Sequence, residues 1–305
     1  MAREKNKTIK RSKSDVIFDG VIFVILTLIL LIVAYPLYFI IISSFSSPDK
    51  VSSGQVVFYP IGFTLEGYKK VFENSQVVTG FINSLIYTTV GTCVNLLLTI
   101  PTAYALSRKK FQGRKAVTIF YMITMFISGG MIPTYLVVQK LGLLDSMWAL
   151  ILPGSLSVYN MIVARTFFQQ NISEELYEAA ELDGCGHGRF FFSIALPLSK
   201  AIIAIMVLYY GVGHWNSYFN ALLYMQTEEK YPLQLVLRSI LVQNSAQLSQ
   251  TITSAAQQEA MRKQQEAVEL MKYSLIIISS IPVLILYPFI QRHFTKGVMI
   301  GSVKG

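Results

Sequence analysis

Charged residues are scarce in this chain of 305 residues. Asp, Glu, Lys and Arg make up only 14% of it, whereas a soluble globular domain carries about 25%. The sequence is 53% hydrophobic and its mean hydropathy is positive. Because the apolar residues are concentrated in long runs without charge, this composition excludes an ordinary soluble protein and indicates an integral membrane protein.

Cysteine pairs and catalytic motifs are also missing. The two cysteines, Cys93 and Cys185, lie in different regions of the chain, which excludes a disulfide framework. The three histidines, His187, His214 and His293, have no metal-type spacing to Cys or carboxylates. The sequence has neither a Gly-x-x-x-x-Gly-Lys-Ser/Thr phosphate loop nor a Gly-x-Ser-x-Gly elbow. We therefore expect no catalytic residue, no metal and no cofactor on this chain, and no enzyme activity of its own.

Long uncharged runs predict six transmembrane helices, and thus an all-α polytopic membrane protein. The first run, Val21–Ile42, exceeds the roughly 20 residues that cross a bilayer core. Gly129, Gly130 and Pro133 interrupt the third run, and such breaks are tolerated where neighbouring helices satisfy the freed backbone groups. The other runs are 81–106, 116–138, 146–164, 201–225 and 273–290.

The basic residues predict the orientation. With the N-terminus inside, 17 of the 26 Lys and Arg residues fall in cytoplasmic segments, including five in Ser107–Lys115. The net charge of +9 is therefore a signal of topology and of contact with lipid headgroups, and it indicates no nucleic-acid partner. Both termini are expected in the cytoplasm.

This orientation divides the chain into segments. A basic cytoplasmic tail precedes the first transmembrane helix, a core of five helices follows, and a cytoplasmic tail ends the chain. The core contains a cytoplasmic loop and a long extracellular loop, which is either a mobile amphipathic hairpin or a platform for an extracellular partner. The N-terminal tail is 1–19, the first transmembrane helix 20–43, the core 81–293 and the C-terminal tail 294–305. Within the core, the cytoplasmic loop is 171–197 and the extracellular loop is 226–272.

The cytoplasmic loop carries the most informative motif. Asn171 and Glu174 have the spacing of a capping box, which predicts a helix running to about Leu182. Gly184 supplies the left-handed backbone that ends such a helix. The motif itself comprises small residues that let another backbone approach and larger ones that can fill a pocket: Tyr177, Glu178, Ala179, Ala180, Leu182, Asp183 and Gly184. An ordinary amphipathic loop helix is the alternative.

Polar and aromatic residues inside the predicted spans are the candidate substrate pathway. Such groups are costly in a membrane unless they are paired or functional. Aromatic faces with amide and hydroxyl groups suit a sugar, although tyrosine and tryptophan also form interfacial belts and interhelical hydrogen bonds. The candidates are Asn83, Tyr159, Asn160, Tyr210, His214, Trp215, Asn216, Tyr218 and Asn220.

The motif and its surroundings resemble a known family. Glu178-Ala179-Ala180, then Asp183-Gly184, then nine residues before Ile194-Ala195-Leu196-Pro197, is similar to the signature loop of permease subunits of ATP-binding-cassette (ABC) importers. Cys185 stands where this family commonly has alanine. The segments Trp215–Leu222 and Pro232–Arg238 resemble the oligosaccharide branch related to the maltose permease, and most closely its aldouronate and complex-polysaccharide members.

This resemblance implies a type I importer fold in a bacterial cell membrane. It implies that Glu178–Gly184 is the coupling helix, which docks on a cytoplasmic ATPase. The implied partners are a second homologous permease, two ATPase subunits that bind ATP and Mg, and an extracellular sugar-binding protein or lipoprotein. An importer for a non-sugar solute remains an alternative. A secondary transporter or channel would need buried carboxylates, and none of the six runs contains Asp or Glu.

Overall fold

The computed structural model describes residues 12–247, 268–269, 271–288 and 291, and every regular element among these residues is helical. Three helices are long and apolar enough to cross a membrane by themselves: α1 (Lys13–Ser44), α4 (Ser75–Ser107) and the last described helix, Met271–Pro288. The all-α membrane class is thus confirmed. The predicted tail 294–305 and most of the N-terminal tail lie outside the described residues.

The remaining candidate spans are pairs of helices joined at a sharp bend. They bring the number of spans to as many as six if each pair crosses once. The bends measure 112° between α5 (Arg114–Phe126) and α6 (Met131–Lys140), and 53° between α7 with η1 (Met147–Gly154) and α8 (Val158–Asn171). The third bend, of 79°, separates His187–Leu198 from α12 (Lys200–Trp215). The first bend lies between Phe126 and Met131 and so contains Gly129 and Gly130, two residues of the predicted interruption.

The end of the predicted span 201–225 is wrong. Helix α12 stops at Trp215, and α13 (Phe219–Tyr224) is a separate short helix. Asn216 is the C-cap of α12, and its side-chain amide donates to the carbonyl of Val212, which also accepts the backbone N–H of Asn216. A polar side chain that competes for a backbone acceptor in this way favours helix termination.

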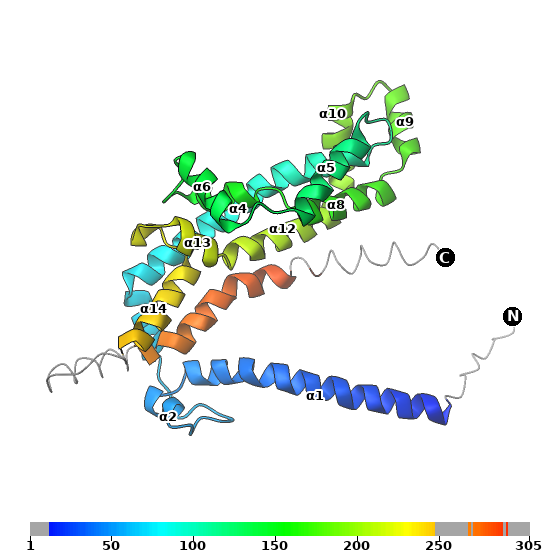
Figure 1. Ribbon diagram of the computed structural model, residues 1–305. Coiled ribbons are helices and arrows are strands. Elements are labelled where there is room, and N and C mark those ends of the chain that lie inside the picture. The colour runs from blue at the N-terminus through cyan, green and yellow to red at the C-terminus, as the bar shows by residue number, and fades with distance from the viewer. Residues whose placement is uncertain (1–11, 248–267, 270, 289–290, 292–305) are drawn as a thin grey trace.

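Helix α1 lies along one side of the molecule (Figure 1). It begins at Lys13, inside the segment predicted as a tail, where Ser12 and Asp15 form a capping box. None of its most apolar window is buried within this chain, and side chains such as Phe23 (70% exposed) face outward. Such a helix is suited to contact lipid or another membrane subunit.

The predicted loop 226–272 contains a packed helix. The loop begins with the short helix η3 (Glu228–Lys230), and α14 (Leu233–Gln247) follows, starting at the fully buried Leu233. Two other short helices, α2 (Pro48–Ser52) and α3 (Glu66–Glu73), lie between α1 and α4. Helix α14 packs on α4 at Gly80, where an added Cβ would lie 3.0 Å from Val236. Glycine therefore permits the close approach of the two helices. Residues 248–267, which belong to the same predicted loop, lie outside the described part.

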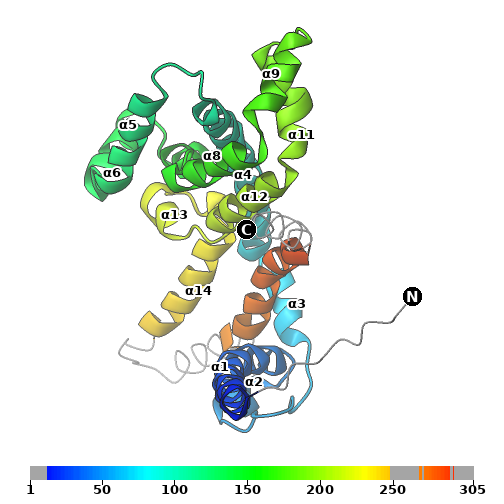
Figure 2. The ribbon, with the colours of Figure 1, turned by 90° about the vertical axis from the view of Figure 1, so that its right-hand side faces the viewer.

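Helices α4, α8 and α12 form the centre of the molecule. They enclose a core that includes Phe168, Phe190 and Met206, all fully buried. Helices α9 (Glu174–Leu182) and α10 (His187–Phe190) extend beyond one end of this centre, on the side where α1 begins, whereas α2, α13 and α14 lie toward the other end (Figures 1 and 2). The motif of the sequence therefore occupies one extreme of the bundle.

Candidate functional site

The signature motif forms helix α9, but its cap differs from the prediction. Ser173 is the N-cap, and its hydroxyl accepts from the N–H of Leu176. Asn171 instead belongs to the last turn of α8, where its amide donates to Phe167. Ile172 is extended and separates the two helices, so the free amides of α9 lie nearest to Ser173. The capping-box prediction is thus wrong by two residues.

The end of α9 follows the prediction. The helix ends at Leu182, and Gly184 adopts a φ of +77°, which glycine does at little cost. The N–H of Gly184 donates to Glu181 and that of Cys185 to Ala180, which satisfies the carbonyls left free by the last turn. The motif residues now form a compact helical tip.

The two sides of this tip differ in exposure. Leu182 is 90% exposed, and Glu178, Ala179, Asp183 and Gly184 are exposed beside it. The outward face therefore combines a large apolar side chain with acidic and small residues. A large apolar side chain held in water marks a surface suited to a protein partner.

Tyr177 and Ala180 lie on the inward side, which corrects the expectation that both serve an open docking face. Tyr177 is 3% exposed and stacks on His187, with ring centroids 5.4 Å apart, and its hydroxyl is hydrogen-bonded to His187 Nδ1. Its ring also meets Phe190 edge-on at 5.0 Å. Burial raises the pKa of Tyr177. These contacts fasten α9 to α10 rather than leave Tyr177 free to enter a partner.

Arg108 links the motif to the membrane helices. It follows α4, is 8% exposed, and donates from Nη2 to the carbonyl of Ile172 at 3.1 Å. Its guanidinium lies 5.5 Å from the ring of Tyr104 and 5.8 Å from that of Tyr177. Arg108 therefore joins the segment that enters α9 to the end of α4.

An exposed ion pair adds a second link between these elements. Lys110 Nζ lies 2.9 Å from Glu181 Oε2, and the hydrogen bond between them raises the pKa of Lys110 and lowers that of Glu181. Because both side chains are about half exposed, solvent screens the pair and its contribution to stability is small. Arg108 is the stronger link.

Two predicted pathway residues, Tyr210 and His214, are hydrogen-bonded at the break between η1 and α8. Asn95 donates to the carbonyls of Gly154 at 2.9 Å and Ser155 at 2.7 Å, and its Oδ1 lies 2.6 Å from His214 Nε2. The hydroxyl of Tyr210 accepts from the N–H of Ser157. These side chains satisfy backbone groups that the broken span leaves free, as a membrane interior requires.

Other predicted pathway residues lie apart from one another. Asn83 donates to the carbonyls of Glu229 and Tyr231, and so joins α4 to the segment before α14. Asn160 is buried, whereas Tyr159 and Asn220 are exposed. The nine predicted residues thus form no single cluster, although three of them meet at a cavity.

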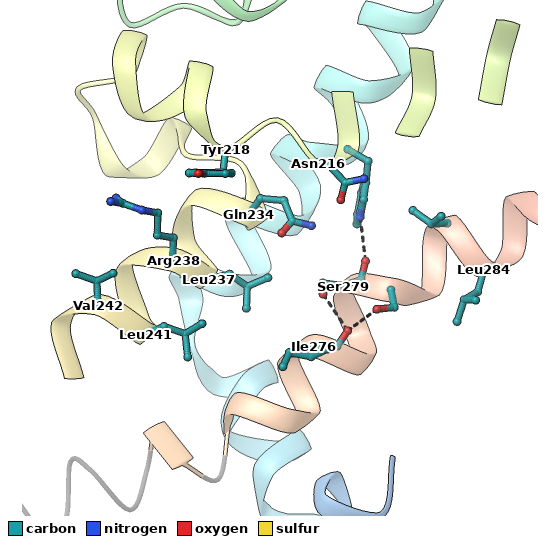
Figure 3. Close-up of a pocket in the computed structure, with 13 residues that line it drawn as sticks. Asn216, Tyr218, Gln234, Leu237, Arg238, Leu241, Val242, Ile276, Ser279 and Leu284 are labelled. Atoms are coloured by element: carbon teal, nitrogen blue, oxygen red, sulfur yellow. Dashed lines mark hydrogen bonds between the residues drawn. The ribbon is translucent and has the colours of Figure 1, made fainter. Parts of the chain in front are cut away.

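This cavity, of about 810 Å³, lies between α12, α14 and the helix Met271–Pro288. Three of the nine candidate pathway residues line it: Trp215, and also Asn216 and Tyr218, which Figure 3 labels. The indole N–H of Trp215 donates to the carbonyl of Ser279, which fixes the ring in the wall. A rigid aromatic wall next to an amide and a hydroxyl suits a sugar, which has apolar faces and a rim of hydroxyls.

Polar residues that the sequence analysis missed complete the lining. Gln234 and Arg238 lie one turn apart on α14 and, with Tyr218, form one side of the cavity, while Leu237 and Leu241 contribute apolar surface (Figure 3). No described carboxylate forms an ion pair with Arg238. The signal was present, because Arg238 is the one charged residue in the apolar stretch from Leu233 to Val242.

A group of hydrogen bonds around Asp145, here called the latch, joins two loop segments at the α14 end of the molecule. Asp145 has a φ of 55°, and its carboxylate accepts from the N–H groups of Gln226 and Thr227, from the Thr227 hydroxyl and from Lys230 Nζ at 2.7 Å. The bond from Lys230, followed by those from Thr227 and Gln226, holds the pKa of Asp145 far below its usual range. The latch joins the segment after α6 to the segment before α14.

We expect Asp145→Asn to lower the Tm of the purified protein by about 2–4 °C at pH 7. Asparagine keeps the left-handed backbone but loses the charge-assisted bonds. Since the folded pKa is depressed, the stabilisation is complete above the unfolded pKa of about 4 and is lost as the pH falls below it. The difference in Tm should therefore shrink at about pH 3. Asp49→Asn, at an exposed site without an ion pair among the described residues, should show no such dependence, and equal behaviour of the two variants would contradict the latch.

Comparisons with known proteins agree with this geometry. Residues 77–300 match the family described as "Binding-protein-dependent transport system inner membrane component". Two relatives from Bacillus subtilis are each 39% identical to this chain. They are the polygalacturonan/rhamnogalacturonan transport system permease protein YtcP (95% of this chain, 99% of the relative) and the protein LplC (98% of each).

A solved structure shares the whole fold. A chain from the crystal structure of a bacterial ABC transporter involved in the import of the acidic polysaccharide alginate superposes with a TM-score of 0.84 at 31% identity. The match covers 94% of this chain and 100% of that one. The overall fold therefore belongs to a known architecture, and the chain is a member of the family of binding-protein-dependent transport system inner membrane components.

Proposed function

We propose that this chain is a permease subunit of an ATP-driven oligosaccharide importer, in which α9 is the docking helix for an ATPase. The observation that carries the proposal is the exposed tip of α9, where Leu182 is 90% exposed beside Gly184, on a chain whose residues 77–300 match the importer family. A protein without a phosphate loop needs a partner to supply energy. The tip offers that partner an apolar contact.

The proposed orientation places α9 in the cytoplasm. Helix α1 begins at the α9 end of the bundle (Figure 1), and the residues before it in the sequence are rich in Lys and Arg. At the same end, Arg108 is bonded to Ile172 and Lys110 is paired with Glu181, and the neighbouring cations between α4 and α5 are Lys109, Arg114 and Lys115. The opposite end, with α14 and Asp145, then faces the outside. In this orientation the ATPase meets α9, and the solute reaches the cavity from the side of α14.

The rest of the proposed assembly follows from the family. It comprises a second homologous permease, two ATPase subunits that bind ATP and Mg, and an extracellular sugar-binding protein or lipoprotein, all at a bacterial cell membrane. The exposed apolar surface of α1 and of the bent pair α5–α6 leaves room for contacts with another permease or with lipid.

The cavity beside Trp215 is the proposed solute contact of this subunit. Its aromatic wall, Asn216 and Gln234 can bind a sugar ring, while Arg238 adds a positive charge without a described partner. Two similar proteins are named for polygalacturonan and alginate, and the latter is called an acidic polysaccharide. An arginine guanidinium can hold a sugar carboxylate through two parallel hydrogen bonds. We therefore propose uronic-acid oligosaccharides as the solute.

The assembly is tested by capture of the tagged chain from native membranes in a mild detergent, followed by mass spectrometry. Co-purification of a second permease and an ATPase, with ATP hydrolysis in the captured sample, is the expected result. Recovery of the chain alone, in a detergent that preserves a known importer, would contradict the proposal.

The solute class is tested by Arg238→Gln. We expect this change to lower uptake of an oligogalacturonide by about tenfold, because a charge-assisted bond is lost. Uptake of a neutral galacto-oligosaccharide by the same cells should not fall. Lys140→Gln, which removes another exposed positive charge at the same end, is the matched control. Unchanged oligogalacturonide uptake in Arg238→Gln would show that this cavity does not select for the carboxylate.

A further inference from the structure

A second cavity, of about 310 Å³, lies at the base of the docking helix. Its walls come from the end of α4, the start of α5, the end of α8 and the start of α9. Three cationic side chains, Arg108, Lys109 and Arg114, line it, against one carboxylate, Glu174. The charge balance of the walls is therefore positive, and it favours an anion.

Arg108 is the buried cationic residue among those that line this cavity. Nη2 is bonded to Ile172, but Nε and Nη1 have no hydrogen-bond partner among the described residues. A guanidinium that is 8% exposed and lacks acceptors for two of its nitrogens carries an unfavourable desolvation cost, which the faces of Tyr104 and Tyr177 offset only in part. An oxyanion in the adjacent cavity, which Arg108 lines, would offset this buried positive charge.

The start of α5 points to the same chemistry. Gly113 is its N-cap, so no side chain caps the helix, and its first turn contains no acidic residue. The N–H of Arg114 donates to Phe111, and the positive end of this helix of 13 residues lies at Arg114, which lines the cavity. A phosphate at such a position gains from the helix dipole and from the neighbouring cations.

Glu174 narrows the choice of ligand. Its Oε1 is buried without a hydrogen-bond partner in the described part of the chain. Because the carboxylate of Glu174 also lines the cavity, a ligand that carries a hydroxyl or an ammonium group beside its anionic group suits the walls better than a bare anion. A glycerophosphate group, which has both a phosphate and hydroxyl donors, satisfies Arg108 and Glu174 together.

We propose that this cavity binds a phosphate group, either in the headgroup of an anionic phospholipid or as a free phosphate. The cavity lies where the apolar helix α4 ends and α5 begins, which is the depth at which lipid headgroups meet a membrane protein. Because its walls include residues from both sides of Ser173, the N-cap of α9, a bound phosphate fastens the docking helix to the α4–α5 junction. The binding site thus controls how firmly α9 is held.

The test uses the full-length chain, purified with its co-expressed partner subunits in a neutral detergent. Native mass spectrometry measures binding of phosphatidylglycerol across a titration, and inorganic phosphate is tested as a ligand and as a competitor. We expect the double variant Lys109→Gln/Arg114→Gln to weaken binding about tenfold, because two charged contacts are lost. Glu174→Gln should strengthen binding of inorganic phosphate, since the like charge is removed, more than binding of phosphatidylglycerol, whose headgroup hydroxyls donate to the carboxylate.

The matched control is the double variant Arg189→Gln/Lys200→Gln, which removes two exposed cations from the same region that do not line the cavity. Its affinity should stay within about twofold of the unmodified protein. Lipid binding that phosphate does not displace identifies the headgroup as the ligand, and binding of phosphate without lipid identifies the free anion. Failure of both probes to bind, or equal weakening in the two double variants, overturns the proposal.

Discussion

Gly184→Asp is expected to reduce solute uptake by about tenfold, while the chain still inserts in the membrane and its partner still hydrolyses ATP. Gly184 has a φ of +77°, which costs a residue with a side chain on the order of 1–2 kcal/mol. A carboxylate at the carboxyl end of α9 also meets the negative end of the helix. A cost of about 1.4 kcal/mol in the docked geometry corresponds to a tenfold loss of the coupled state.

The chain provides a matched control for this change. Gly142 follows α6 as Gly184 follows α9 and has a φ of +67°. At both glycines an added Cβ would meet no atom within 4 Å beyond the adjoining residues. Gly142→Asp therefore carries the same backbone strain and the same added charge at the opposite end of the bundle. It should retain uptake.

The measurements are uptake in whole cells, ATP hydrolysis by the purified assembly and the amount of chain in the membrane. Gly184→Asn separates strain from charge, because asparagine tolerates the left-handed region and is neutral. Uptake at the normal rate in Gly184→Asp would contradict the role of α9 as the docking helix. Equal losses in Gly184→Asp and Gly142→Asp would assign the effect to general instability.

Local signals in the sequence predicted the parts of the fold that depend on local physics. The lengths of two apolar runs predicted that α1 and α4 exist as long helices. The backbone freedom of glycine predicted that α9 ends before Gly184. The cap of α9 was misplaced because Asn171 and Ser173 are both suitable N-caps. Only the path of the chain out of α8 decides between them.

The functional side chains were harder to predict because their roles depend on tertiary contacts. Tyr177 and Leu182 are both large residues of one motif, yet one is 3% and the other 90% exposed. Tyr210 and His214 are as polar as Asn216, but they face a broken helix that no local pattern reveals. The role of Arg108 could not be predicted for the same reason, because its hydrogen-bond partner Ile172 is distant in sequence.

Asn95→Leu is expected to destabilise the protein by about 2–4 kcal/mol. Asn95 is fully buried, and leucine has a similar size without any hydrogen-bonding group. The change leaves the carbonyls of Gly154 and Ser155 and the Nε2 of His214 without their partner. Each such group costs about 1–3 kcal/mol in a protein interior, and less in a membrane, where the unfolded reference also finds partners.

The loss is measured as the temperature at which the monodisperse gel-filtration peak disappears in detergent, and a fall of about 5–10 °C is expected. Asn171→Leu is the control, because Asn171 is an exposed asparagine with one hydrogen bond, to Phe167. It should shift the temperature by about 1 °C or less. Equal shifts in the two variants would mean that the Asn95 network does not support the break between η1 and α8.

Variants of the Asn95 network distinguish two roles for His214, support of the helix break and contact with the solute. If His214 acts through Asn95 at the helix break, His214→Phe lowers the temperature, and the double variant with Asn95→Leu costs less than the two single changes together. If His214 contacts the solute, His214→Phe lowers uptake and leaves the temperature unchanged. Gly91 favours the first result, since an added Cβ there would lie 2.6 Å from His214 Nε2. The ring therefore lies against α4, and its Nε2 is bonded to Asn95, while His214 does not line the cavity beside Trp215.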